Sequence, residues 1–219
     1  MIIHTPGRVS YAVGLELQEA ARTRVVSGGD DELLLLEHER VVTMGRRGGV
    51  IDRVALERLE TPVIETDRGG LATWHGPGQL VGYPIVDLSR RGLKVPDFVA
   101  LLGSSLAAVV VSLGVADARY DHDLPGVFVG DRKLAAIGLH LRRNVSTHGF
   151  ALNVNNDLGG FGAIVPCGLT HIEVTTLVRE LDREVDLQDV LERVEGALLE
   201  RLASRGVQKG DRAPVGAPF

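Results

Sequence analysis

The chain has 219 residues, 44% of them hydrophobic, with a single cysteine and a formal net charge of −5 at pH 7. This length and composition predict one large domain that buries about 70% of the surface it exposes when unfolded. One cysteine excludes an internal disulfide framework and indicates a reducing cytoplasm, and the negative charge argues against a general nucleic-acid-binding protein.

The first third of the chain predicts one amphipathic helix and several short strands. The helix covers residues 11–26 and ends at Gly28-Gly29. Residues 33–36 and 41–42 predict short buried strands, and residues 80–86 predict another. Pro84 in that last strand indicates a sheet edge or an irregularity, because proline has no N–H to donate. The N-terminus lacks the basic-then-apolar order of a signal peptide, so we expect a cytoplasmic protein.

Residues 98–116 pass without a charged side chain, which raises the question of a membrane span. However, glycines and serines interrupt the segment, and Phe98, Leu102 and Leu106 fall on one helical stripe. We therefore predict a buried helix over residues 95–113, opened by proline and aspartate in its first turn, and no membrane contact.

The second half predicts a hairpin, a further strand and a final helix. Residues 127–129 and 134–141 form the hairpin, which turns at Gly130-Asp131. Residues 150–154 follow as a strand, and the helix over residues 187–203 begins after Asp186, with Asp189 placed as the acidic residue of a capping box. Strands and helices do not alternate strictly, which favours a single α/β domain with a mixed sheet. Residues 206–219 have no periodic apolar face, so we expect a loosely ordered tail after a folded domain of residues 1–205.

Two segments are unusually rich in glycine and in reactive side chains. Residues 68–83 contain five glycines, the only tryptophan and His75, and residues 130–168 contain Lys133, His148 and Cys167. Dense glycine indicates positive φ angles or a close approach of the backbone to something else, although a pair of tight turns would explain the first segment equally well.

Cys167 and Lys133 are candidate catalytic partners. A lone cysteine is most often a small buried hydrophobe, and it becomes a nucleophile only near a cation, a base or a helix N-terminus. Strand alternation places Lys133 at the head of an apolar row formed by residues 135, 137, 139 and 141. There the lysine either extends past the strand end or is desolvated and able to accept a proton from a thiol.

Other motifs argue against cofactors. No phosphate-binding Gly-x-x-x-x-Gly-Lys-Ser/Thr loop is present, and the glycine spacing at 76, 78 and 82 misses the dinucleotide pattern by one residue. Asp121-His122-Asp123 could bind a metal, but it lacks a second ligand cluster. We therefore expect neither cofactor nor metal. His75 and His148 could orient substrate or assist proton transfer, although structural hydrogen bonding is the commoner role.

The motifs together resemble the lipoyl(octanoyl) transferase family, the lipoate-protein ligase B type. The resemblance begins near Leu33 with Leu-Leu-Leu-Leu-Glu-His and Val-Thr-Met-Gly-Arg at 42–46, and continues through Arg-Gly-Gly-x-x-Thr-x-His-Gly-Pro-Gly-Gln-Leu from Arg68 and Lys-x-Ala-Ala-Ile-Gly from Lys133. It ends in His-Gly-x-Ala-Leu-Asn-Val from His148, Asp-Leu at 157–158 and Pro-Cys-Gly at 166–168. The composite is specific, whereas each piece alone would be weak.

The resemblance implies the α/β catalytic fold of biotin and lipoate ligases, a single domain with a mixed, largely antiparallel sheet flanked by helices, and a cytoplasmic octanoyltransferase. Such an enzyme moves an octanoyl group from acyl carrier protein, through a thioester on Cys167 with Lys133 as base, to a lysine of a lipoyl domain. The implied acceptors are the E2 subunits of 2-oxoacid dehydrogenases and the glycine cleavage H protein. The implied substrate contacts are Arg68, Gly69, Gly70, Leu71, Ala72, Thr73, Trp74, His75, Ala136, Ile137, Gly138, Gly149, Phe150 and Ala151, with His148 in a supporting role.

Two alternatives remain at this point. One is an ATP-dependent lipoate or biotin ligase of the same fold, and the other is a non-catalytic module that binds acyl carrier or lipoyl domains with an inert Cys167. For docking of an acidic carrier protein, the pairs Arg46-Arg47, Arg90-Arg91 and Arg142-Arg143 are candidates, with Arg142-Arg143 preferred because it closes the strand that Lys133 begins.

Overall fold

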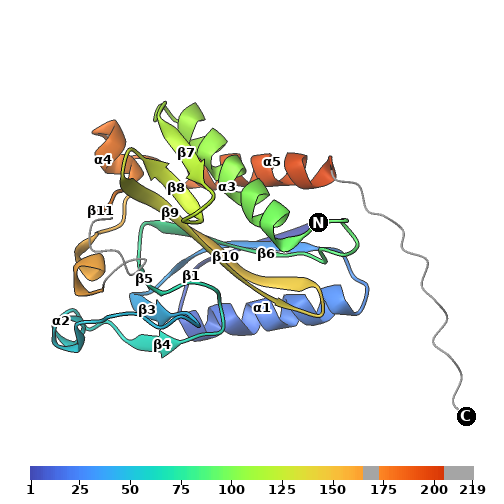
Figure 1. Cartoon of the computed structure of the whole chain (residues 1–219), viewed down its shortest axis with the longest axis horizontal. Helices are drawn as coiled ribbons and strands as arrows, with labels where there is room; N and C mark the ends of the chain where they lie inside the picture. Colours follow the sequence, from blue (N-terminus) through green and yellow to red (C-terminus); the bar gives the residue numbers. More distant parts are fainter. Residues whose placement is uncertain (165–172, 205–219) are drawn as a thin grey trace, which may run out of the picture.

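The structure is a computed structural model that describes residues 1–164 and 173–204. A large mixed sheet forms its centre, with a small sheet beside it (Figure 1). The order in the large sheet is β1 (Ile2–Val9), β2 (Glu32–His38), β6 (Gln79–Ile85), β10 (Val145–Asn153), β9 (Arg132–Arg142), β8 (Gly126–Val129) and β7 (Ala118–Asp121), and β11 (Glu173–Val174) also pairs with β9. The order in the small sheet is β4 (Val63–Glu65), β3 (Val41–Met44) and β5 (Ala72–His75). Among the strands of the described residues, only the pairs β1–β2, β9–β11 and β3–β4 are parallel, so the prediction of a mixed, largely antiparallel sheet is confirmed.

Helices cover both faces of the large sheet. In Figure 1, α3 (Val95–Ser112) and α5 (Leu187–Ala203) lie above the sheet, and α1 (Tyr11–Val26) lies below it. The main core forms between the sheet and α3 and α5, and a second core lies between β2, β6 and α1. A third, smaller core joins the small sheet to α2 (Arg53–Arg58) and the 3₁₀ turn Gly159–Ala163; α4 (Leu177–Leu181) packs on the main core through Leu177.

The three long helices and the hairpin of β8 and β9 confirm the sequence predictions. Among the described residues, α3 is the one helix long and apolar enough to cross a membrane. Its stripe of Phe98, Leu102 and Leu106 is completely buried in the main core, as predicted for a buried helix. Burying an apolar side chain of this size stabilises the fold by about 1.5–3 kcal/mol.

Pro84 does not mark a sheet edge, because β6 lies between β2 and β10 in the interior of the sheet. The alternative prediction of an irregularity is confirmed. Pairing between β6 and β10 stops at Gly82, and beyond it His148 has a left-handed backbone with φ 57°. The ladder is interrupted here, and the His148 N–H donates instead to Oε1 of Gln18 at 2.7 Å.

Asp189 is not part of a capping box. Its carboxylate accepts hydrogen bonds from Nε of Arg193 at 2.9 and 3.0 Å, while the Asp186 side chain caps α5 by accepting from the Gln188 N–H. An acidic residue three positions after the cap can also pair with a cation one turn later, and that alternative is the one adopted.

Candidate active site

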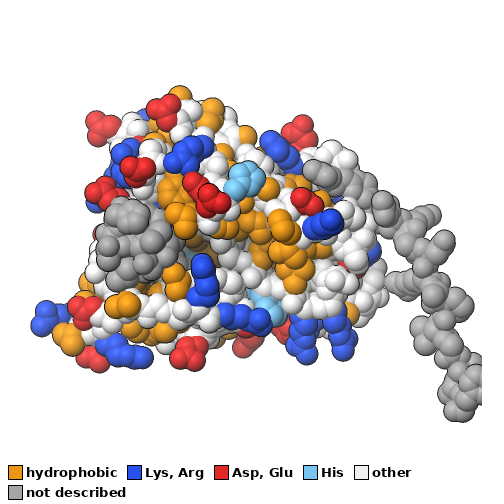
Figure 2. All heavy atoms as spheres, viewed as in Figure 1, with side chains coloured by type: hydrophobic (Ala, Val, Ile, Leu, Met, Phe, Trp, Pro, Cys, Tyr) orange, Lys and Arg blue, Asp and Glu red, His pale blue; other side chains and the backbone are white. Residues whose placement is uncertain are grey.

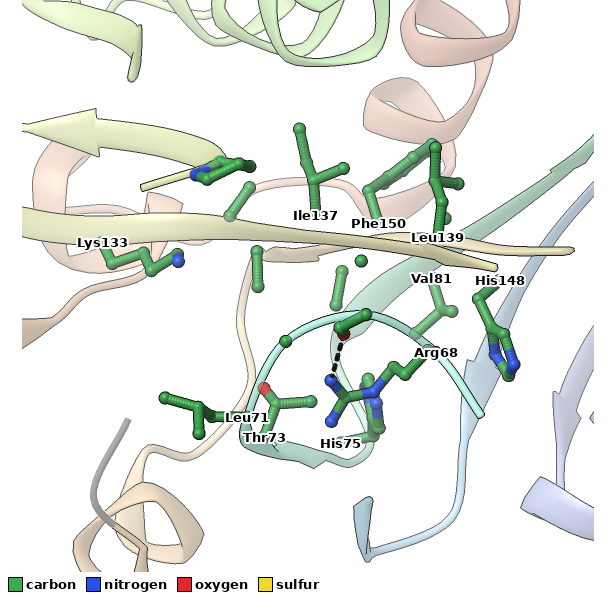
Figure 3. A pocket seen from close by; sticks show the side chains of 18 of the residues that line it. Arg68, Leu71, Thr73, His75, Val81, Lys133, Ile137, Leu139, His148 and Phe150 are labelled. Carbon is green, nitrogen blue, oxygen red and sulfur yellow. Dashed lines mark hydrogen bonds between the residues drawn. The ribbon is translucent and has the colours of Figure 1, made fainter. Parts of the chain in front are cut away.

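A cavity of about 340 Å³ lies beside β9 and β10, and the segment that leads into β5 forms its opposite wall (Figure 3). This volume is at the lower end of the range of small-molecule sites, about 300–1,000 Å³. Figure 2, viewed as in Figure 1, shows hydrophobic side chains exposed across the middle of this face of the molecule, with charged side chains between and around them. Of the residues predicted from sequence, the cavity is lined by Arg68, Gly69, Gly70, Leu71, Ala72, Thr73, His75, Lys133, Ala136, Ile137, Gly138, His148, Gly149, Phe150 and Ala151.

Trp74 is the one predicted contact within the described residues that does not line the cavity. Successive side chains of a strand point to opposite faces, so Thr73 and His75 face the cavity and Trp74 faces away. The indole is buried in the third core, where its ring meets that of Phe161 edge-on at 5.6 Å. It also packs against Gly160, where a Cβ atom would lie 2.1 Å from the indole nitrogen.

Lys133 faces the cavity, and not the apolar row that strand alternation predicts. The pairing of β8 with β9 contains a bulge at Leu134, and this one extra residue in β9 reverses the alternation. Figure 3 accordingly shows Lys133 on the side of β9 that faces Arg68, and Ile137 and Leu139 on the other side. The lysine is only 8% exposed.

The surroundings of the Lys133 ammonium restrict its position. Its Nζ lies 5.4 Å from the centroid of the Phe128 ring, a distance typical of cation–π contact. Gly126 provides room for the stem, because a Cβ atom there would lie 2.7 Å from Cε of Lys133. A later part of the chain, β11, also lies beside Lys133. It pairs with β9, and the Thr175 N–H that follows β11 donates to the carbonyl of Lys133 at 3.0 Å.

Cys167, with Pro166 and Gly168, lies outside the described residues. The flanking positions are described on both sides: Ile164 bridges to Ile51, and Val174 pairs with Lys133 and lines the cavity.

A chain of buried hydrogen bonds crosses the floor of the cavity. Nδ1 of His75 donates to Oε1 of Gln79 at 2.8 Å, and Nε2 of Gln79 donates to Oδ1 of Asn153 at 2.8 Å. Asn153 in turn donates to the carbonyl of Thr175, beside β11, at 3.0 Å. Burial, with the nearby charge of Arg68 and the ring of His38, lowers the pKa of His75 to about 3, so the ring is neutral at physiological pH.

A second buried histidine lies next to the first and was not predicted. Nδ1 of His38 donates to the carbonyl of Val9 at 3.1 Å, so its Nε2 accepts from the Tyr83 hydroxyl at 2.7 Å. Burial lowers the pKa of His38 to about 4 and raises that of Tyr83. Tyr11 stacks on His75 with ring centroids 6.3 Å apart. The polar histidine that ends the buried strand β2 was the one available sequence signal.

Arg68 and Asp67 are neighbours that point to different sheets. The Arg68 guanidinium donates to the Thr43 carbonyl at 2.6 Å and to the Thr43 hydroxyl at 2.8 and 3.1 Å, and so binds β3 of the small sheet. The Asp67 carboxylate accepts from Nε2 of His148 in β10 at 2.9 Å and lies 3.4 Å from Nε2 of His140 in β9. Burial lowers the pKa of His148, and the bond to Asp67 offsets part of that effect.

The arginine pairs are distributed unevenly around the site. Arg143 and the following asparagine have positive φ at the turn between β9 and β10, and about nine residues of strand, or roughly 30 Å, separate this turn from Lys133. Of the three pairs, only Arg46-Arg47 contributes a cavity-lining residue, Arg47. Arg90 and Arg91 instead bind the buried carboxylate of Asp31. No group of three or more histidine, cysteine or acidic side chains in the described parts of the chain is arranged to hold a metal ion.

Comparison with known proteins agrees with this fold. Residues 10–199 match the family described as lipoyl protein ligase A/B catalytic domain. A lipoate-protein ligase A solved with bound ATP superposes with a TM-score of 0.72 at 18% identity, covering 93% of this chain and 84% of that one. A biotin protein ligase from Leishmania major superposes with a TM-score of 0.59 at 15% identity, covering 93% and 75%. The chain belongs to the lipoyl protein ligase A/B catalytic-domain family.

The curated relatives are more specific. The octanoyltransferase of Mycolicibacterium gilvum is 47% identical over 207 residues, covering 91% of this chain and 84% of the relative. The octanoyltransferase of Mycobacterium tuberculosis is 44% identical over 211 residues, covering 95% and 89%. Within its family the chain therefore belongs with the octanoyltransferases, which confirms the resemblance found in the sequence motifs.

Proposed function

We propose that the protein transfers an octanoyl group from acyl carrier protein to a lysine of a lipoyl domain, through a thioester on Cys167. The observation that carries this proposal is the cavity, in which small residues of β9 and β10 leave an apolar slot with Lys133 at one end. The seven carbon–carbon bonds of an octanoyl group, each about 1.5 Å long, extend over at most about 10 Å, so β9 is long enough to hold the chain along its length.

The chemistry proceeds in two balanced steps. In the first, the neutral amine of Lys133 accepts the thiol proton, the Cys167 sulfur attacks the carrier thioester, and the carrier sulfur leaves as a thiol by taking that proton back from Lys133. In the second, Lys133 removes a proton from the ammonium of an acceptor lysine and passes it to solvent, and the resulting amine attacks the new thioester. An amide forms, and the second proton of the amine passes through Lys133 to the departing Cys167 sulfur, which is released as a thiol. A thioester is exchanged for a thioester before the more stable amide forms, so no ATP is needed. General acid–base assistance of this kind contributes about 10²–10⁴ in rate.

Lys133 suits the role of base because of its position. It is buried beside the Phe128 ring, at a point where the main chain of Thr175 approaches β9. Val174, seven residues after Cys167 in the sequence, pairs with Lys133. This pairing supports Lys133 as the base in the proposed mechanism.

The partners follow from the proposed reaction. The donor is octanoyl-acyl carrier protein, and the acceptors are the lipoyl domains of 2-oxoacid dehydrogenase E2 subunits and the glycine cleavage H protein, in the cytoplasm. A solved relative of the fold, from Thermoplasma acidophilum, is a bi-partite lipoate protein ligase studied with its E2 lipoyl domain; it is 18% identical to this chain. Because Lys133, the proposed base, must act where the carrier delivers its thioester, we expect docking near Arg47, which lines the cavity, and not at the distant Arg142-Arg143 turn.

The decisive experiment is the intact mass of the protein after mixing with octanoyl-acyl carrier protein and no acceptor. We expect a single octanoyl adduct that hydroxylamine removes, as it does from a thioester. Cys167→Ala should give neither adduct nor turnover while its thermal unfolding stays that of the wild type. Transfer by Cys167→Ala would contradict the thioester mechanism, and a strict need for ATP would favour the ligase alternative. A protein that binds the carrier but never forms the adduct would favour the non-catalytic module.

A further inference from the structure

The segment from Thr66 to Leu71 forms one wall of the cavity and is attached to both sheets at adjacent residues. Arg68 ties it to the small sheet through Thr43, as described above. Asp67 ties it to the large sheet through His148 and His140, a group that we call the Asp67 clasp (Asp67, His140 and His148). The two sheets therefore meet across the cavity through two consecutive side chains.

Backbone contacts show that this wall fits the large sheet closely. The Gly69 N–H donates to the Leu139 carbonyl at 2.9 Å. A Cβ atom on Gly138 would lie 2.8 Å from the Gly69 carbonyl oxygen, so even a methyl group would separate the wall from β9. The glycine-rich sequence of the wall thus serves a close approach between two backbones.

His148 is held in position by contacts from three directions. Its left-handed backbone, with φ 57°, is costly for a residue that has a Cβ atom, and such a conformation persists only when its surroundings stabilise it. The Gln18 side chain binds its N–H from α1, Tyr83 meets its ring edge-on, and Asp67 accepts from its Nε2. The ring lines the cavity at the end remote from Lys133.

Asp67 is the accessible member of the clasp. Its side chain is 58% exposed, whereas that of His148 is 4% exposed. Removing Asp67 therefore deletes an ionic hydrogen bond without opening a cavity in any core. Lys133, the proposed base, lies at the other end of β9, so the clasp and the base are separable by mutation.

We propose that Asp67 is a positioning residue for acyl binding, which acts through His148 to hold the wall of residues 66–71 closed over the far end of the acyl chain. The acyl ligand in this proposal rests on the proposed function. The closed wall fixes the width of the slot around the terminal carbons, and so it determines how tightly an eight-carbon chain is held relative to a longer one.

The test combines a structural readout with a kinetic one. In Asp67→Ala, hydrogen exchange of the Gly69 amide should accelerate about tenfold, because the wall opens locally without global unfolding. The KM for a small octanoyl thioester should rise about five- to tenfold, because Asp67→Ala removes one charge-assisted hydrogen bond that solvent exposure already weakens. The value of kcat should change little. The ratio of kcat/KM for octanoyl over decanoyl thioester should fall. Asp67→Asn, which keeps one acceptor oxygen, should lie between Asp67→Ala and the wild type.

The matched control is Glu65→Ala, which removes the same charge from an exposed side chain two residues earlier and should leave both readouts at wild-type values. A double-mutant cycle identifies the route: in a background that carries both His140→Phe and His148→Phe, Asp67→Ala should change KM less than twofold, because both histidine contacts that it breaks are already absent. Unchanged Gly69 exchange in Asp67→Ala would overturn the proposal, and so would a full KM effect that persists in that background.

Failure of the proposed function is distinguishable from failure of the clasp. If the wild-type protein transfers no octanoyl group, the binding of octanoic acid measured by calorimetry replaces KM. Weaker octanoic acid binding and faster Gly69 exchange in Asp67→Ala would still support the clasp, and their absence would overturn it.

Discussion

Acid should destabilise this protein through its buried histidines, and His75 gives the sharpest case. Burial lowers the pKa of His75 from 6.5 to about 3, so between those values the unfolded chain binds a proton that the native state excludes. Stability is therefore greatest above pH 6.5 and falls as the pH is lowered towards 3.

The magnitude follows from the two pKa values. An unfolded histidine is roughly 25% protonated at pH 7.0 and 90% at pH 5.5, while the native ring stays neutral at both. Integrating the proton uptake gives a loss of about 1.2 kcal/mol in the free energy of unfolding between these pH values for this one side chain. His38, whose pKa is lowered to about 4, should add about as much.

The assay is urea unfolding at pH 7.0 and 5.5, followed by the fluorescence of the single buried tryptophan, Trp74. Carboxylates also titrate in this range, but they do so equally in wild type and variant. His75→Gln should therefore lose about 1.2 kcal/mol less than the wild type on acidification, at an unchanged m-value. The control His122→Gln removes an exposed ring and should lose as much as the wild type. If wild type and His75→Gln lose equal free energy, His75 is not held neutral by burial and the reasoning is wrong.

Three further predictions concern the chemistry and the packing. Lys133→Ala should slow both half-reactions and raise the pH at which Cys167 is alkylated, and an unchanged alkylation profile would remove Lys133 from the mechanism. Lys133→Arg should not restore activity, because arginine stays protonated and cannot act as a base. Transfer from octanoyl-acyl carrier protein should proceed at full rate with EDTA and without ATP, since the thioester already carries the driving force; dependence on ATP would contradict this. Gly82→Ala should lower the free energy of unfolding measured in urea by about 1–3 kcal/mol, because its Cβ would lie 2.1 Å from the buried Phe150 ring. Gly196→Ala in α5 should raise it by about 0.5–1 kcal/mol, because alanine favours the helix more than glycine does and its Cβ would meet nothing within 4 Å.

The sequence predicted which residues form the site better than it predicted the direction in which their side chains point. One cavity is lined by the glycine-rich segment from Arg68 and by the motifs at Lys133 and His148. Trp74 is the exception: it points to the other side of β5, a strand whose boundaries the sequence did not reveal. The Asp67 clasp has no sequence signal, because Asp67 and His148 are separated by 81 positions and meet only when two sheets pack together.

The three long helices, α1, α3 and α5, and the hairpin of β8 and β9 were determined by the sequence itself. Their signals are local: a stripe of apolar residues, a capping side chain or a glycine turn acts over one or two turns of chain, and its energy depends little on distant partners. In the small sheet only β3 was predicted, at residues 41–42; β4 and β5, which span three and four residues, lack such signals.

Tertiary structure decided the two points on which the site depends most. Lys133 faces the cavity because β8 and β9 pair with a bulge at Leu134, and one extra residue reverses every side chain before it. Pro84 lies within the sheet because β10 interrupts its own ladder at His148, beside the proline that has no N–H to donate. Alternation along one strand cannot reveal either feature, because register is a property of two paired strands.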